Sequence, residues 1–199
     1  MNRLIWTCVL LVVLAIGVTA PALAQYGDEG NQKLAVSVGL YSPSGTTLRD
    51  EGGSMWKSVN IGYNIGVDSI GRPTSIVSLG YSGVKKDQFD GRRISLNYMR
   101  MFHVNKSSDE IHGLYYGAGV GVNLVKEKID AQIAWPDPDR PYLMTGEDNS
   151  GTQFGFNVVA GYHLSASFFV EVQYSQMSEL AKNVNFSGLM LSIGTRSIF

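Results

Sequence analysis

The sequence Gly-Leu-Tyr-Tyr-Gly-Ala-Gly-Val-Gly-Val-Asn-Leu, residues 113 to 124, decides the fold because it alternates between two kinds of side chain. One set is bulky and apolar: Leu114, Tyr116, Ala118, Val120, Val122 and Leu124. The other is small or polar: Gly113, Tyr115, Gly117, Gly119, Gly121 and Asn123. Successive side chains of a β-strand point to opposite faces, so this period predicts a strand. The small face lacks Lys and Glu and does not resemble a soluble exterior, whereas the bulky face is typical of a surface that contacts lipid.

The same alternation recurs along most of the chain. Seven further segments show it, namely residues 34–41, 56–67, 74–82, 92–102, 152–164, 168–176 and 186–199. A tilted strand needs about 9 to 11 residues to cross a membrane, and these segments are near or above that length. We therefore predict an all-β protein, an eight-stranded antiparallel up-and-down transmembrane β-barrel.

A soluble barrel with a central ligand site is the alternative fold, and it would reverse the two faces. Its interior could not hold so many aromatic and branched side chains. The charged residues within the predicted strands are few: Arg92, Arg93, Arg100, Glu171 and Arg196. Arg100 falls on the apolar face of its strand, and its direction stays open because a bulge could turn it inward.

Aromatic side chains gather near the ends of the predicted strands, as in the aromatic girdles of membrane barrels. We expect one girdle at the outer interface and one at the inner interface. The outer girdle would contain Trp56, Tyr81, Phe154 and Tyr174, and the inner one Phe102, Tyr116, Tyr162, Phe168 and Phe199. The connections after the first, third, fifth and seventh strands are together longer than the others. Because bacterial barrels have short periplasmic turns, we expect these connections outside the cell and both termini on the periplasmic side.

The N-terminus has the features of a cleaved signal peptide. A short basic start at Arg3 precedes an apolar run, and Ala22-Leu23-Ala24 provides a small-residue cleavage site. A permanent transmembrane helix is the alternative, but the run is shorter than the ~20 residues that spanning requires. We predict a signal peptide at residues 1–24, a periplasmic N-terminal tail at 25–33 and the barrel at 34–199. The only cysteine, Cys8, lies in the predicted signal peptide, so the mature chain would have no thiol chemistry.

Composition excludes several classes of function. The formal net charge is −1 and no basic stripe occurs, which argues against binding to nucleic acid. Charged residues make up 17% of the chain, below the usual ~25%. His103, His112 and His163 have no ligand-like spacing, so we expect no metal and no cofactor.

The chain as a whole resembles the small outer-membrane barrels of the OmpA, OmpX and OmpW type. The sharpest local feature is Ser-Ile-Gly-Thr-Arg-Ser-Ile-Phe, residues 192 to 199. It looks like the assembly signal of that family, with Gly194 followed by a terminal Phe199, although Ser197 stands where the family usually has a hydrophobic residue. The resemblance implies location in the outer membrane, contact with its lipid and lipopolysaccharide, and insertion by the barrel-assembly machinery through strand pairing.

Glu171 and Arg196 lie on neighbouring predicted strands, face inward and fall near the periplasmic end. We expect an ion pair between them, joined by His163 and Lys33. This lumen cluster could act as a gate or as a structural plug, and we favour the plug because buried charges need partners. The inward residues Tyr41, Met99, Tyr115 and Met190 are expected to help close the lumen.

The sequence gives little support for an enzymatic activity. The lipid A deacylase barrels have a His-x-Ser element near their last long loop, and Gln176-Met177-Ser178-Glu179 resembles it loosely. Gln176 cannot serve as a general base. His163 precedes Ser165 at the same spacing, but at a predicted periplasmic turn with the histidine inward. We therefore predict no enzymatic activity.

The longest connection, residues 126–150, is the expected place of any specific function. Its tip contains Trp135, Asp137, Asp139 and Arg140. An exposed Trp and rigid prolines suit a partner-binding tip, carboxylates could hold a divalent cation, and a solvated loop without a ligand stays open as well. The sequence thus favours a structural or surface-interaction role through extracellular loops. The alternative is a narrow channel or transport route for small solutes, including apolar ones.

Overall fold

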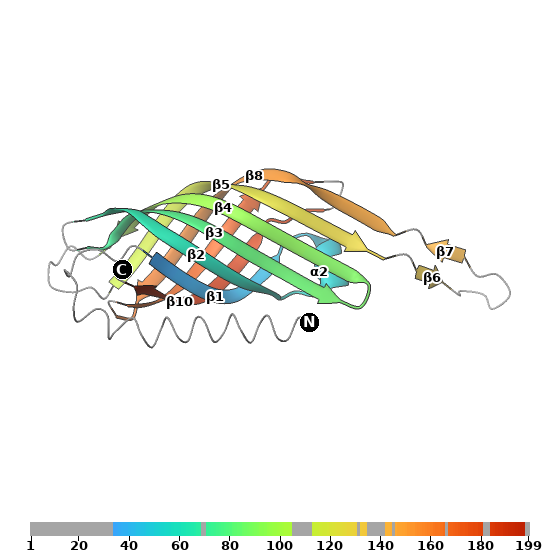
Figure 1. Cartoon of the computed structure of the whole chain (residues 1–199), viewed down its shortest axis with the longest axis horizontal. Coiled ribbons are helices and arrows are strands. Elements are labelled where there is room, and N and C mark those ends of the chain that lie inside the picture. Colours follow the sequence, from blue (N-terminus) through green and yellow to red (C-terminus); the bar gives the residue numbers. More distant parts are fainter. Residues whose placement is uncertain are drawn as a thin grey trace.

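The computed structural model is a closed β-barrel with a small helix and a small hairpin at one end (Figure 1). The structure describes residues 34–68, 71–104, 113–130, 132–134, 142–144, 146–165, 167–180 and 184–197. Its elements are β1 (Leu34–Pro43), α2 (Thr46–Gly52), β2 (Trp56–Val67), β3 (Pro73–Lys86), β4 (Phe89–His103), β5 (Gly113–Ile129), β6 (Gln132–Ala134), β7 (Tyr142–Met144), β8 (Glu147–His163), β9 (Phe168–Met177) and β10 (Gly188–Ser197).

Each barrel strand pairs antiparallel with the next barrel strand along the chain, and the first pairs with the last. The order around the barrel is β1-β10-β9-β8-β5-β4-β3-β2, with β6 and β7 forming a separate two-stranded sheet. Closure runs from Leu34 opposite Ser197 to Pro43 opposite Gly188. A closed sheet leaves no unpaired strand edge. The prediction of an eight-stranded antiparallel up-and-down barrel is therefore confirmed.

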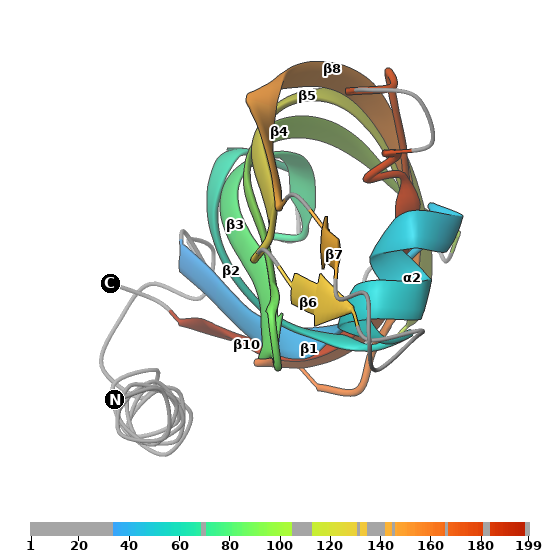
Figure 2. The same cartoon turned by 90° about the vertical axis from the view of Figure 1, so that its right-hand side faces the viewer.

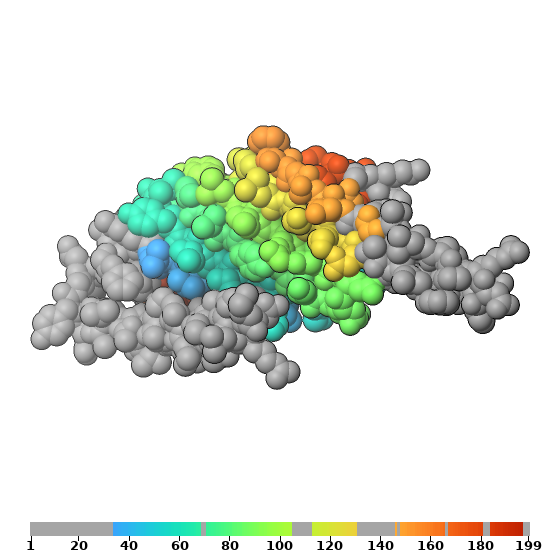
Figure 3. Space-filling model, turned by 45° about the vertical axis from the view of Figure 1, so that its right-hand side comes forward, coloured from blue at the N-terminus to red at the C-terminus, as the bar shows by residue number. Residues whose placement is uncertain are grey.

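The two faces of the wall are as the alternation predicts. Bulky apolar side chains cover the outside, with Leu96, Val120 and Phe154 exposed to 53%, 63% and 69%. Polar side chains such as Asn97 and Asn123 are buried inside. Figure 3 shows one side of the wall, where side chains from β2 to β8 cover the surface without a hollow. Among the described residues, no helix is both long and apolar enough to cross a membrane.

Arg100 lies on the outer face of β4. The register of β4 is unbroken against both β3 and β5, so no bulge turns the side chain inward. The register shifts instead between β2 and β3, around Gly66. The guanidinium of Arg100 donates a hydrogen bond over 3.0 Å to Oγ of Ser75, the residue opposite it on β3.

Four strands are longer than the sequence predicts by four or five residues. β3 and β4 continue to a two-residue turn at Asp87 and Gln88, where Asp87 has a positive φ of 47°. β5 continues to Ile129, and β8 starts at Glu147. The outward positions of these extensions are charged except at Gly83 and Ser150, and none is a bulky apolar residue. The apolar pattern therefore stops while the hydrogen-bonded ladder continues. The connection between β3 and β4 is consequently shorter than expected, and connection length alternates less regularly along the chain.

The two ends of the barrel differ. Leu34 and Ser197 are paired at one end, and we call it the terminal end. The connections that contain α2 and the β6–β7 hairpin are at the other end (Figure 1), which we call the loop end. The view from that end shows α2 at the rim of the ring with β6 and β7 in front of the opening (Figure 2). α2 contacts β1, β3 and β4, which belong to one consecutive run of strands in the ring.

Candidate functional site: the barrel interior

An apolar cluster fills the lumen at the loop end. It consists of Tyr41, Leu48, Trp56, Phe89, Val125, Met177, Val184, Phe186 and Met190, and we call it the loop-end plug. Leu48 comes from α2, so the helix contributes to the plug. The indole of Trp56 is fully buried at its centre, with ring centroids 5.9 Å from Tyr41, 6.0 Å from Phe89 and 5.9 Å from Phe186. These contacts close the lumen at this end with packed hydrocarbon.

The position of Trp56 corrects the predicted outer girdle. Trp56 has the same parity as Ser58, which faces the lumen, whereas the intervening Lys57 is exposed. The indole is inside and donates a hydrogen bond over 3.1 Å to the carbonyl of Gly53. Tyr81 and Phe154 do face outward as expected. At the terminal end, Phe102 and Tyr116 also face outward and stack at 5.5 Å.

A network of polar side chains crosses the middle of the lumen. Asn157 donates to Asn97 over 3.0 Å, and it accepts hydrogen bonds from Ser175 and Gln173 over 2.7 and 3.1 Å. Because these amides and hydroxyls are buried, their mutual bonds replace the ones that water would make. The network therefore holds strands β4, β8 and β9 at a fixed separation across the lumen.

Arg93 adds a buried cation that the sequence argument did not place inside. Its Nε donates over 3.0 Å to Oδ1 of Asn123 and its Nη2 over 3.2 Å to Oγ of Ser175. The guanidinium carbon lies 4.9 Å from the ring centroid of Tyr41, a distance typical of a cation–π contact. Glu127, on the extended part of β5, is also buried and accepts a hydrogen bond from Asn149 over 3.2 Å. The parity of both residues in their strands is the signal that could have located them.

The terminal end of the lumen holds the predicted Glu171, Arg196 and His163 together with Tyr115 and Phe169. Tyr115 donates a hydrogen bond over 2.9 Å to Oε2 of Glu171. Nη1 of Arg196 lies 2.6 Å from Nδ1 and 3.0 Å from Nε2 of His163. The same guanidinium is 4.5 Å from the ring of Phe169 and 5.6 Å from that of Tyr115. Since a guanidinium can only donate, the ring nitrogen of His163 that accepts its hydrogen bond must carry a lone pair.

The expected direct ion pair between Glu171 and Arg196 does not form. None of the ion pairs within the described ranges joins them. The register explains this, because Glu171 lies opposite Ser192, four residues before Arg196 on β10, and a strand rises ~3.3 Å per residue. The phenol of Tyr115 contacts both residues and links the two charges. Lys33, which was expected to join them, lies outside the described residues.

Small residues on the inward face leave room for these rings. A Cβ atom at Gly161 would lie 2.3 Å from Cζ of Tyr115, and one at Gly194 would lie 2.3 Å from Cζ of Phe169. A side chain at either position would therefore collide with an aromatic ring of the cluster. Gly194, predicted as part of the assembly signal, has this packing role in the folded barrel.

A small cavity adjoins the cluster in the described part of the lumen. Its volume is about 30 Å³, and its lining includes Asn60, Ser78, Met99, Glu171, Gln173 and Arg196. A cavity needs about 10–15 Å³ of such space to hold one water molecule. The cavity is thus large enough for about two water molecules.

The remaining predicted residues either make local structural contacts or lie outside the described residues. Ser165 accepts hydrogen bonds from the backbone N–H groups of Ser167 and Phe168 over 3.2 and 3.0 Å, so it stabilises a turn. Gln176 accepts a hydrogen bond from Tyr174 over 2.6 Å. Within the ranges given above, no group of three or more His, Cys, Asp or Glu side chains could hold a metal. The tip residues Trp135, Asp137, Asp139 and Arg140, the terminal Phe199 and residues 1–33 lie outside the described residues.

Comparisons with known proteins show the fold. No protein-family model matches the sequence, and no curated protein matches it. The barrel is similar to the crystal structure of Neisserial surface protein A, with 13% sequence identity, a TM-score of 0.51, and coverage of 83% of this chain and 96% of that chain.

Two further structures have lower TM-scores. The N-terminal β-barrel domain of Pseudomonas aeruginosa OprF is 14% identical, with a TM-score of 0.48 over 84% of this chain and 97% of that chain. Ail, the attachment invasion locus protein of Yersinia pestis, is 16% identical, with a TM-score of 0.45 over 85% and 99%. The chain therefore has the fold of a small outer-membrane barrel, as its resemblance to that group implies.

Proposed function

We propose that the protein is an outer-membrane barrel with a structural or surface-interaction role, in which a filled lumen supports the connections at the loop end. The observation that carries this proposal is the pairing of an apolar exterior with a polar, packed interior. Soluble monomers rarely expose contiguous apolar patches larger than a few hundred Å². Bulky apolar side chains are exposed here on all eight barrel strands. Hydrocarbon around the barrel would cover them.

The filled lumen favours a scaffold over a channel. The loop-end plug occupies one end of the lumen, and the cluster around Tyr115 and Arg196 occupies the other. Between them lies a cavity of about 30 Å³, which has room for about two water molecules. A solute could pass only if buried aromatic side chains moved aside. The transport alternative therefore requires a rearrangement of both ends.

Sidedness and export belong to the same proposal. Residues 1–24 would direct export and be removed, residues 25–33 would form a periplasmic tail, and Gly194 with Phe199 would serve recognition by the barrel-assembly machinery. The loop end would then face the outside of the cell, in contact with lipopolysaccharide. The packing of His163 against Arg196 and the turn bonding of Ser165 support a role without catalysis.

The test separates a scaffold from a channel. Mature protein is inserted into planar bilayers, and the bilayer current is recorded under an applied voltage, with a general porin as the positive control. We expect no discrete currents, and sustained single-channel currents would overturn the scaffold proposal. In a second arm, residues 131–145 are deleted. The deletion variant should still show the heat-modifiable gel mobility of a folded barrel, since the barrel wall does not include this segment; loss of folding would contradict its assignment as a surface connection.

A further inference from the structure

The outer face of β4 and β5 changes abruptly from apolar to charged toward the loop end. Ile94 lies opposite Leu124, and this is the last apolar pair. The next outward pair is Arg92 opposite Lys126, and the one beyond is Asp90 opposite Lys128. If lipid covers the apolar face, as proposed above, then Arg92 and Lys126 lie at the level where the hydrocarbon ends.

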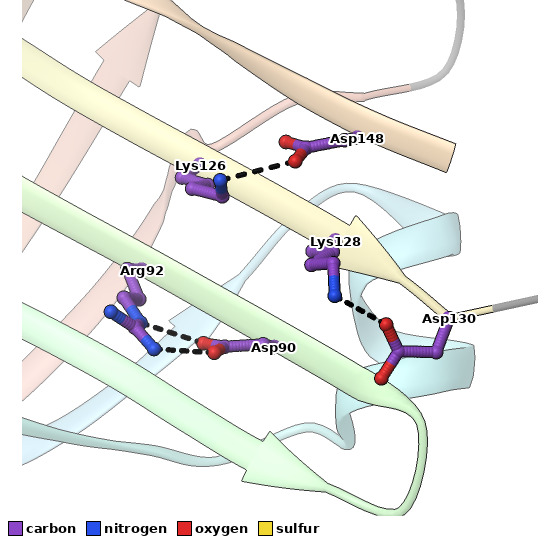
Figure 4. Close-up of polar contacts among 6 residues, drawn as sticks. All are labelled: Asp90, Arg92, Lys126, Lys128, Asp130 and Asp148. Atoms are coloured by element: carbon purple, nitrogen blue, oxygen red, sulfur yellow. Dashed lines mark hydrogen bonds and ion pairs between the residues drawn. The ribbon is translucent and has the colours of Figure 1, made fainter. Parts of the chain in front are cut away.

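The pair Arg92 and Lys126 places like charges directly opposite each other on neighbouring strands. Such a pair is destabilising unless an anion lies between the two cations. Carboxylates come only from the next row, away from the apolar face (Figure 4): Asp90 accepts from Arg92 over 2.7 and 2.5 Å, and Asp148 accepts from Lys126 over 3.1 Å. These ion pairs are solvent-exposed and therefore weak. A guanidinium has five N–H groups and an ammonium three, so both cations keep donors for a second anion.

The phenolic hydroxyl of Tyr81 extends into the same row as the two cations. Gly83 lies opposite Arg92 on β3. A Cβ atom at Gly83 would be 2.6 Å from Oη of Tyr81, so the phenol extends from the apolar row over this glycine. Tyr81 itself lies opposite Ile94. A guanidinium, an ammonium and a phenolic hydroxyl thus come from three adjacent strands at the edge of the apolar face.

We propose that Arg92, Lys126 and Tyr81 bind the phosphate group of a membrane-lipid headgroup. Phosphate oxygens suit this donor set, because Arg binds them in a bidentate manner and Lys neutralises charge. The acyl chains of the same lipid would lie along Ile94 and Leu124, which continue the site into the apolar face.

When phosphate displaces Asp90 from Arg92, the carboxylate of Asp90 still has cationic neighbours in its own row. Asp90 lies between Lys85 and Lys128 in register, so it keeps two cationic neighbours when Arg92 turns to phosphate. Lys128 also contacts Asp130 over 2.5 Å (Figure 4). The alternation of charge in this row makes it self-compensating, whereas the row of Arg92 and Lys126 has no acid of its own on β3, β4, β5 or β8.

The test measures lipid preference by native mass spectrometry. Protein is folded in phosphatidylcholine vesicles containing a minor fraction of phosphatidic acid, which carries a phosphate monoester, and the lipids retained by the protein are counted. We expect retention of phosphatidic acid in excess of its share, and at least a fivefold loss of that preference in the double variant R92Q/K126Q. The matched control R49Q/K86Q removes the same charge from exposed positions outside the site and should keep the preference. Y81F should lower it in part.

Three outcomes would overturn the inference. These are no preference in the native protein, an equal loss in the control variant, and displacement of the lipid by millimolar inorganic phosphate, which would identify the free ion as the ligand. Folding in the vesicles is scored separately by heat-modifiable gel mobility. A protein that folds and inserts without lipid preference contradicts this site alone, whereas a protein that does not insert contradicts the proposed membrane location.

Discussion

Replacing Trp56 by alanine removes the side chain at the centre of the loop-end plug. The indole is fully buried, contacts three aromatic rings at 5.9 to 6.0 Å and bonds the carbonyl of Gly53. Trp to Ala changes at buried sites cost about 3–5 kcal/mol. We expect the free energy of unfolding to fall by about 4 kcal/mol, which is close to a thousandfold in the folding equilibrium.

The assay is urea unfolding of the mature protein in phospholipid vesicles, followed by gel mobility and far-UV circular dichroism. The control is Val120→Ala on the outer face, where only contacts with lipid are lost and a change below about 1 kcal/mol is expected. Bilayer current is recorded in parallel, and we expect none from Trp56→Ala, because the cluster around Tyr115 still closes the terminal end. A loss of stability below about 1 kcal/mol would refute burial of the indole and return Trp56 to an interfacial position.

Three further substitutions test other parts of the barrel. Val120→Arg places a charge on the proposed lipid face and should destabilise the vesicle-bound barrel by about 2–4 kcal/mol; a change within ~0.5 kcal/mol would indicate a water-exposed site. Tyr115→Phe removes the hydrogen bond to Glu171 and should cost about 1–3 kcal/mol in the same titration, so an unchanged midpoint would show that the carboxyl does not depend on this donor. Gly119→Leu would bring a Cβ within 1.9 Å of the carbonyl oxygen of Tyr98; we expect no heat-modifiable band, and a normal yield of folded barrel would contradict the close approach of β4 and β5.

Alternation predicts the strands and their two faces, because side-chain direction in a strand depends on parity alone. Val120 and Asn123 illustrate this, since each lies on the face that its parity assigns. The strand ends are less predictable. Beyond the apolar face the outward residues are charged, as at Lys126 and Lys128, and the sequence then resembles a loop although the ladder continues. α2 carries one buried apolar residue, Leu48, and a single residue gives no helical period.

The interior contacts depend on the relative positions of strands, which no single strand encodes. Glu171 and Arg196 share a face on neighbouring strands, but their offset in register separates them. Tyr115 reaches Glu171 although β8 lies between β5 and β9. The inward direction of Arg93 could have been predicted from the sequence, because its parity differs from that of the exposed Arg92. Its partners Asn123 and Ser175 come from β5 and β9 and could be known only from the closed barrel.

The central claim is that the apolar outer face contacts hydrocarbon while the lumen is filled. Its most direct test is a spin label at Val120→Cys in vesicle-inserted mature protein, with accessibility measured to oxygen, which concentrates in hydrocarbon, and to a water-soluble nickel complex. The account predicts high accessibility to oxygen and low accessibility to nickel at this exposed position. High accessibility to nickel and low accessibility to oxygen would place Val120 in water and contradict it.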